Sequence, residues 1–171
     1  MQNSGIILYK KENNKLYFLL IQNNLTILNK KNILFSDIGD TVKNLNDNID
    51  DIALLSFYEN TLGLSYSFKE LQNLEKQVFT NPKYNYQITF VNKDINKDTL
   101  DKINKVRSYL NSNIINNNKN NLNKQKCNPN INISNTLKWF ELSEILNNPQ
   151  NFESKFMNTF LKSLKNKTIL I

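Results

Sequence analysis

A chain of 171 residues is long enough to form one domain with its own hydrophobic core. It has no histidine and a single cysteine, Cys127, which excludes intramolecular disulfides, zinc sites of histidine and cysteine, and histidine general bases. Any metal would therefore be held by oxygen, as Mg²⁺ or Mn²⁺ on carboxylates, while the formal charge of +7 suits a polyanionic ligand.

Two short runs near the N-terminus predict a β-hairpin. Residues 5–10 (GIILYK) and 16–22 (LYFLLIQ) are rich in β-branched and aromatic residues, and the connection ENNK is short enough for a tight turn. Residues 25–29 (LTILN) extend the same sheet, and FSDIGD after them supplies turn residues. This part of the chain is therefore expected to form a small antiparallel sheet.

From Ile49 onward the apolar spacing becomes helical and predicts an α-helix. Asn48 is a suitable N-cap, and Asp50 and Asp51 favour the positive end of the helix dipole. Gly63 is a suitable C-cap residue. The two aspartates are therefore interpreted as helix-start charges rather than ligands.

The second half of the chain predicts a strand followed by helices. Residues 86–92 (YQITFVN) alternate as a strand does, residues 97–115 have the spacing of an amphipathic helix, and residues 116–130 are a low-complexity segment expected to form a flexible loop. Strands interleaved with helices predict an α/β or α+β sandwich in a single domain over 1–171. A C-terminal helix is marked by an apolar face of Phe152, Phe156, Phe160 and Leu164.

With these elements in place, residues 33–64 (ILFSDIGDTVKNLNDNIDDIALLSFYENTLGL) resemble the signature of Nudix hydrolases, particularly the divergent forms of large DNA viruses. In that family a strand ends in two glycines, and after a loop a helix carries Arg-Glu and Glu-Glu before a last glycine. The segments SGIILYK, LYFLLIQ, YQITFV and KWFELSEILNN are similar to the family's strands and its C-terminal turn and short helix. The resemblance implies an α/β/α sandwich with a mixed sheet, and a helix whose carboxylates bind Mg²⁺ against a pyrophosphate.

The preferred alignment with this signature replaces most of its charged residues. Asp40 stands in place of the second glycine, and Leu55 in place of the helix arginine. A second register puts Phe57 on the helix glutamate and Asn60-Thr61 on the glutamate pair, and it keeps fewer acids. The signature positions in the preferred alignment are Gly39, Asp47, Ala53, Ser56, Glu59, Asn60 and Gly63.

The helix face that would bind metal in the family holds a single acid here. Ser56, Glu59 and Asn60 share that face and present one hydroxyl, one carboxylate and one amide. One carboxylate is a poor Mg²⁺ site. The resemblance therefore implies a degenerate site without an assigned catalytic residue, no cofactor, and a protein retained for binding RNA, a nucleotide or a protein partner.

Two alternatives remain open at this point. The first is an active, divergent hydrolase that cleaves nucleoside diphosphate linkages, including the messenger RNA cap, with Mg²⁺ or Mn²⁺ on Glu59 and with Asp47 assisting. The second is an unrelated α/β domain whose resemblance is accidental. In a purely structural role, Glu59 is a solvated helix glutamate, Gly39 is a turn residue and Gly63 is a helix cap.

Positive charge gathers in the predicted helix over 97–115 and in the segment after it. This stripe is expected to follow an RNA backbone, or else to be a solvated helix face. The apolar face of the C-terminal helix is expected to close the core, or else to pack on a protein partner. The candidate nucleic-acid contacts are Lys97, Lys102, Lys105, Arg107, Lys119, Lys124 and Lys126.

The N-terminal segment MQNSGIILYKK has no basic leader, and no apolar run reaches the roughly 20 residues that span a bilayer. We therefore expect an intracellular, cytoplasmic protein that does not cross a membrane. A viral setting, which the resemblance implies, would place it in the host cytoplasm or the virion.

Overall fold

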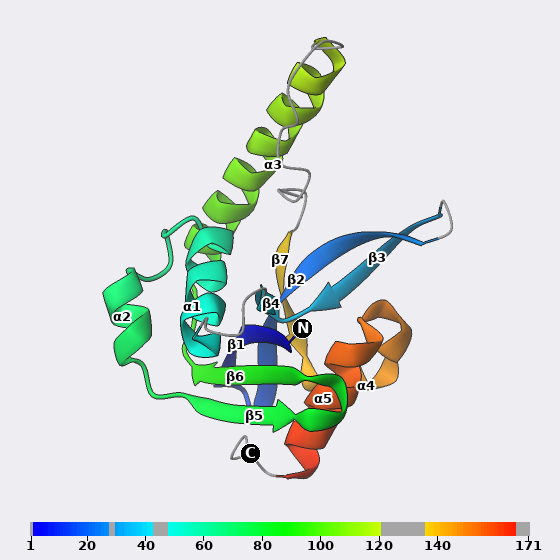
Figure 1. Ribbon diagram of the computed structural model, residues 1–171. Helices are drawn as coiled ribbons and strands as arrows, with labels where there is room; N and C mark the ends of the chain where they lie inside the picture. The colour runs from blue at the N-terminus through cyan, green and yellow to red at the C-terminus, as the bar shows by residue number, and fades with distance from the viewer. Residues whose placement is uncertain (1, 28–29, 43–47, 121–135, 167–171) are drawn as a thin grey trace.

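A mixed β-sheet lies between two groups of helices in the computed structural model, which describes residues 2–27, 30–42, 48–120 and 136–166 (Figure 1). The predicted α/β sandwich is therefore confirmed. Five strands follow one another in the order β3-β2-β1-β6-β5, while β4 pairs with β1 and β7 with β2. The strands are β1 (Gln2–Glu12), β2 (Lys15–Ile27), β3 (Lys30–Ser36), β4 (Ile38–Val42), β5 (Gln77–Asn81), β6 (Tyr86–Asn92) and β7 (Leu137–Glu141).

The central strand β1 has three neighbours. Its first half pairs antiparallel with β4, its second half pairs antiparallel with β2, and β6 runs parallel to it. The turn from β1 to β2 consists of Asn13 and Asn14, whose φ angles of 50° and 59° are those of a tight hairpin turn that asparagine tolerates. The predicted hairpin and the predicted strand over 86–92 are both confirmed.

Successive residues of β1 point into two separate cores, because side chains alternate across a strand. Ile6 and Leu8 pack with α1 (Ile49–Asn60) and α3 (Lys97–Asn120) on one face. Ile7 and Tyr9 pack with α5 (Ser154–Lys165) on the other. The shorter helices are α2 (Phe68–Asn73), α4 (Leu142–Asn147) and the 3₁₀ turns η1 (Pro82–Tyr84) and η2 (Pro149–Asn151).

Some elements depart from the sequence-based expectations. The helix α3 continues to Asn120, so residues 116–120 are helical where a loop was predicted, and residues 121–130 lie outside the described part of the chain. Its second half projects from the domain in Figure 1. Trp139 lies in strand β7, where a turn was expected, and α2 and β5 fall in a region that gave no clear pattern.

The apolar face near the C-terminus closes the core. Phe156 and Phe160 of α5 are fully buried, and Phe152, just before the helix, is nearly so. The Phe156 and Phe160 rings are stacked, and Phe160 meets Phe18 of β2 edge to face. These three aromatic side chains are therefore buried within the domain, as expected for a face that closes the core. None of the helices in the described residues is long and apolar enough to cross a membrane.

Candidate functional site

The helix α1 carries the signature positions and forms as its sequence predicts. The Asn48 side chain caps it by accepting a hydrogen bond from the Asp50 backbone N–H at 3.0 Å. The Asp50 carboxylate accepts a bond from Gln87 of β6 at 2.7 Å, which fixes the first turn against the sheet. Ala53 and Ser56 face inward, while Glu59 is exposed. Asp47 lies outside the described residues.

Asn60 connects the end of α1 to α3 through a buried arginine. Its amide donates to the Ser56 backbone oxygen at 2.8 Å and to the Ser56 hydroxyl at 3.2 Å. Arg107 donates to both the backbone and the side-chain oxygen of Asn60, the latter at 3.2 Å. Burial lowers the pKa of Arg107 to about 10, still well above neutrality, so the guanidinium remains charged. Arg107 thus engages Asn60 directly, and Asn60 in turn engages Ser56.

The acids that the structure describes in this region do not form a cluster of metal ligands. No group of three or more acidic or cysteine side chains in the described residues is placed to hold a metal ion. Glu59 is alone on its turn of α1, and the Glu70 carboxylate accepts hydrogen bonds from the backbone and hydroxyl of Ser67 in a capping box. Glu70 is therefore engaged in a helix cap, and the described residues form no cluster of three such ligands that includes Glu59.

The two signature glycines have structural reasons to be glycine. Gly39 of β4 lies opposite Gly5 of β1, and a Cβ atom on it would fall 2.1 Å from the Ser4 carbonyl oxygen. Gly63 has a φ of +62° and donates its N–H to the Tyr58 carbonyl at 2.9 Å, which ends α1 in a left-handed turn. Both glycines are required by close packing or turn geometry whether or not the site has an activity.

A polar pocket of about 170 Å³ opens beside Gly39, at the N-terminal ends of β1 and β6. Its deepest charged group is Asp37, which joins β3 to β4 and is only 3% exposed. The Tyr86 hydroxyl donates to Asp37 Oδ1, whereas Oδ2 accepts no hydrogen bond from the described residues. Burial raises the pKa of Asp37 to about 7, the bond from Tyr86 opposes this, and the Glu153 charge adds to it.

The wall and rim of this pocket are also polar. Glu153, just before α5, accepts a hydrogen bond from the Asn23 amide at 2.7 Å, and that amide also reaches the Ser36 hydroxyl at 2.8 Å. The exposed Lys155 and Asp40 stand at the rim. The pocket therefore offers oxygen acceptors in its interior and a cation at its mouth. This arrangement suits a ligand with N–H donors at one end and a negative charge at the other.

Sequence reasoning did not find this pocket, although one signal was present. Asp37 is an acid within the otherwise uncharged run ILFSDIG, and a charged residue between two strands is seldom fully buried without a reason. Its partners come from β6 and from the start of α5, far away in sequence. Only the folded chain brings them together.

The basic stripe is only partly described. Lys97, Lys102 and Lys105 are exposed on α3, as an RNA contact requires. Arg107 is 4% exposed and bound to Asn60, so it is not on that surface, which corrects its assignment as a phosphate contact. The remaining candidates lie where side chains are not described, with Lys119 on α3 and Lys124 and Lys126 beyond it.

Comparison with known proteins gives one fold-level likeness. No protein-family model matches the chain, and no curated protein matches it. A solved structure of a MutT/Nudix family protein from Listeria innocua is similar over 60% of this chain and 69% of its own, with 21% sequence identity and a TM-score of 0.39. The chemistry of this chain is therefore drawn from its own residues.

Proposed function

We propose that this chain is a Nudix-type α/β domain that binds a nucleotide and does not hydrolyse it. The observation that carries the proposal is the buried carboxylate of Asp37, which has one oxygen held by Tyr86 and the other without a donor. A buried acceptor without a partner is costly, and a ligand N–H that reaches it removes that cost. The exocyclic amino group of a nucleobase is such a donor.

The charges around the pocket support a nucleotide rather than a nucleoside. Lys155 at the rim supplies a cation for a phosphate group, while the interior holds carboxylate and hydroxyl oxygens that would repel one. The base is therefore oriented inward and the phosphate outward. Adenine, guanine and cytosine carry an amino group and uracil does not, so the pocket should prefer the first three bases.

We expect no hydrolysis because of the side chains on α1, the helix on which Nudix hydrolases carry their metal ligands. The Asn60 amide donates a hydrogen bond to the Ser56 hydroxyl, and Arg107 brings a positive charge to the C-terminal end of α1. A guanidinium there opposes the binding of a divalent cation. Glu59 alone would have to recruit Mg²⁺, which usually needs further carboxylates or substrate phosphates.

Calorimetric titration with ATP, GTP, CTP and UTP tests the binding half of this proposal. We expect the three amino-bearing nucleotides to bind the wild-type protein more tightly than UTP, and Asp37→Asn to remove this preference. The variant Asp101→Asn, which deletes an exposed carboxylate on α3, is the matched control and should bind as the wild type does. Lys155→Met should weaken nucleotides without affecting nucleosides.

Other outcomes would assign the protein differently. Equal affinity for all four nucleotides, unchanged in Asp37→Asn, would show that the Asp37 pocket does not bind the base. Binding of RNA that falls steeply with salt and depends on Lys97, Lys102 and Lys105 would favour the basic face of α3 instead. Metal-dependent turnover lost in Glu59→Gln would favour the divergent hydrolase.

A further inference from the structure

The strand β5 is the last strand on one side of the sheet, and its outer edge is open (Figure 1). It pairs with β6 alone, in an antiparallel register that places Phe79 opposite Ile88. Within the described part of the chain, the backbone groups of residues 77–80 form no hydrogen bond outside this pair. Because alternate residues of a strand point their N–H and C=O groups to opposite sides, the outer groups of β5 are left to water or to a further strand.

The composition of β5 does not protect this edge. Natural edge strands are commonly shielded by lysine, proline or a bulge, which discourage pairing with another chain. The sequence of β5 (QVFTN) contains no charged residue and no proline, and its register with β6 is unbroken. The edge strand β3, at the other end of the strand order, begins by contrast with Lys30 and Lys31. The open edge of β5 therefore has the properties of a pairing surface.

The side chains of β5 divide between a core face and an exposed face. Phe79 packs against the core that α5 covers, and Asn81 is buried. Val78 and Thr80 lie on the opposite face, where Val78 is 47% exposed and Thr80 is also exposed. Both are β-branched residues, which favour strands and pair well across them. A further strand beside β5 would cover an apolar side chain that the single domain leaves in water.

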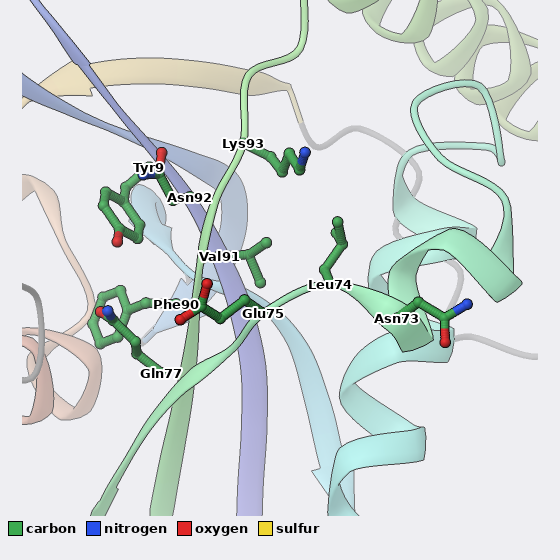
Figure 2. Close-up of a pocket in the computed structure, with 9 residues that line it drawn as sticks. All are labelled: Tyr9, Asn73, Leu74, Glu75, Gln77, Phe90, Val91, Asn92 and Lys93. Atoms are coloured by element: carbon green, nitrogen blue, oxygen red, sulfur yellow. The ribbon is translucent and has the colours of Figure 1, made fainter.

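Opposite charges lie at the two ends of this edge. Glu75, just before β5, is in the lining of a cleft of about 520 Å³ at the C-terminal ends of β1 and β6 (Figure 2). Lys83 comes just after β5, and both side chains are exposed and in no ion pair within the described residues. Lys76, beside Glu75, donates to the Gln72 backbone oxygen at 3.2 Å. An antiparallel partner strand would bring the acid of one edge to the base of the other.

We propose that two copies of this chain associate through β5, antiparallel about a two-fold axis at Phe79. This register places Val78 of one copy opposite Thr80 of the other. It also places Glu75 of each copy opposite Lys83 of the other, so the charge pair occurs twice. Two-fold pairing occupies both open β5 edges, and association through them ends at a dimer. A ladder of five residues is short, so the dimer should be weak and should dissociate on dilution.

Sedimentation equilibrium over a series of protein concentrations tests for this dimer, independently of nucleotide binding. We expect the wild type to shift from monomer to dimer as its concentration rises. Val78→Lys should raise the dissociation constant about tenfold or more, because it places a charge on the apolar edge. Ile33→Lys, a like change at an exposed position of β3, is the matched control and should dimerise as the wild type does. A dimer that Val78→Lys leaves unchanged would overturn the proposal. A wild type that stays monomeric would also overturn it, and would leave the edge to a strand of another protein.

Exchanging the charges at the two ends of β5 tests the register, at low salt where ion pairs are least screened. Glu75→Lys sets two lysines opposite each other and Lys83→Glu sets two glutamates, so each single variant should dimerise about tenfold more weakly than the wild type. The double variant restores opposite charges, and so does a mixed dimer formed from equal amounts of the two single variants. Both should recover the association of the wild type. Single variants that associate as the wild type does, or no recovery in either combination, would contradict the register and overturn the proposal.

Discussion

The buried carboxyl group of Asp37 depends on a glycine in the neighbouring strand. A Cβ atom on Gly5 would lie 2.0 Å from Asp37 Oδ2, so a larger residue at that position displaces the carboxylate. The Tyr86 hydroxyl fixes the other oxygen, and burial raises the pKa of Tyr86, so it keeps the proton that it donates. Gly5 and Tyr86 therefore hold an acid in a place where its ionised form is disfavoured.

The raised pKa of Asp37 makes stability depend on pH. Between the ordinary aspartate value of 3.8 and about 7 the folded chain holds a proton that the unfolded chain has lost, so stability falls as pH rises through this window. From pH 5 to pH 8 the wild-type free energy of unfolding should fall by roughly 2 to 3 kcal/mol relative to Asp37→Asn. Urea unfolding of both proteins at several pH values measures the difference. Parallel curves for the two would show that Asp37 titrates normally.

Gly5→Ala tests whether the position of the carboxylate matters for binding. The added methyl group should push Asp37 aside and abolish the preference for amino-bearing nucleotides. Lys11→Ala is the control on the same strand, because Lys11 is exposed and does not line the pocket, so the base preference should be unchanged. Base preference that survives in Gly5→Ala would contradict the geometry proposed for the pocket.

The elements α1 and α3 are joined by the charged side chain of Arg107. Arg107 reaches the last residue of α1 and satisfies both oxygens of Asn60, one of them a helix-terminal carbonyl. The same contact keeps the Asn60 side chain turned toward Ser56. Ser56 and Asn60 of α1 therefore serve to dock α3.

Arg107→Met should destabilise the domain by about 2 to 4 kcal/mol, since it leaves the oxygens of Asn60 without their donor in a buried place. Lys105→Met on the exposed side of the same helix should change stability by no more than about 0.5 kcal/mol. Thermal or urea unfolding compares them. Equal effects of the two substitutions would show that Arg107 is a surface residue in practice.

The sequence predicted the elements whose signals are local. Alternation marked the hairpin and β6, the Asn48 cap marked the start of α1, and the helical spacing of phenylalanines marked α5. It did not predict that Arg107 would be buried, because the partner Asn60 is 47 residues away. The Asp37 pocket was missed for the same reason. Such groups are defined by tertiary contacts and not by patterns within one segment.

At the scale of the whole molecule, the two cavities lie at opposite ends of the parallel pair β1 and β6. One holds a buried carboxylate with a cation at its mouth, and the other has the exposed Glu75 in its lining. The helix α1 packs on the face of the sheet opposite α5, and Arg107 links it to α3 through Asn60.

Hydrolysis of the nucleotides that bind is the most direct test of this account. Capped RNA and a panel of nucleoside diphosphate and triphosphate compounds would be incubated with Mg²⁺ or Mn²⁺ and with wild type or Glu59→Gln, using protein whose binding is verified by titration. We predict nucleotide binding that depends on Asp37 and no product above the protein-free background for either protein. Turnover by the wild type that Glu59→Gln abolishes would contradict the account and establish a working site with a single helix carboxylate.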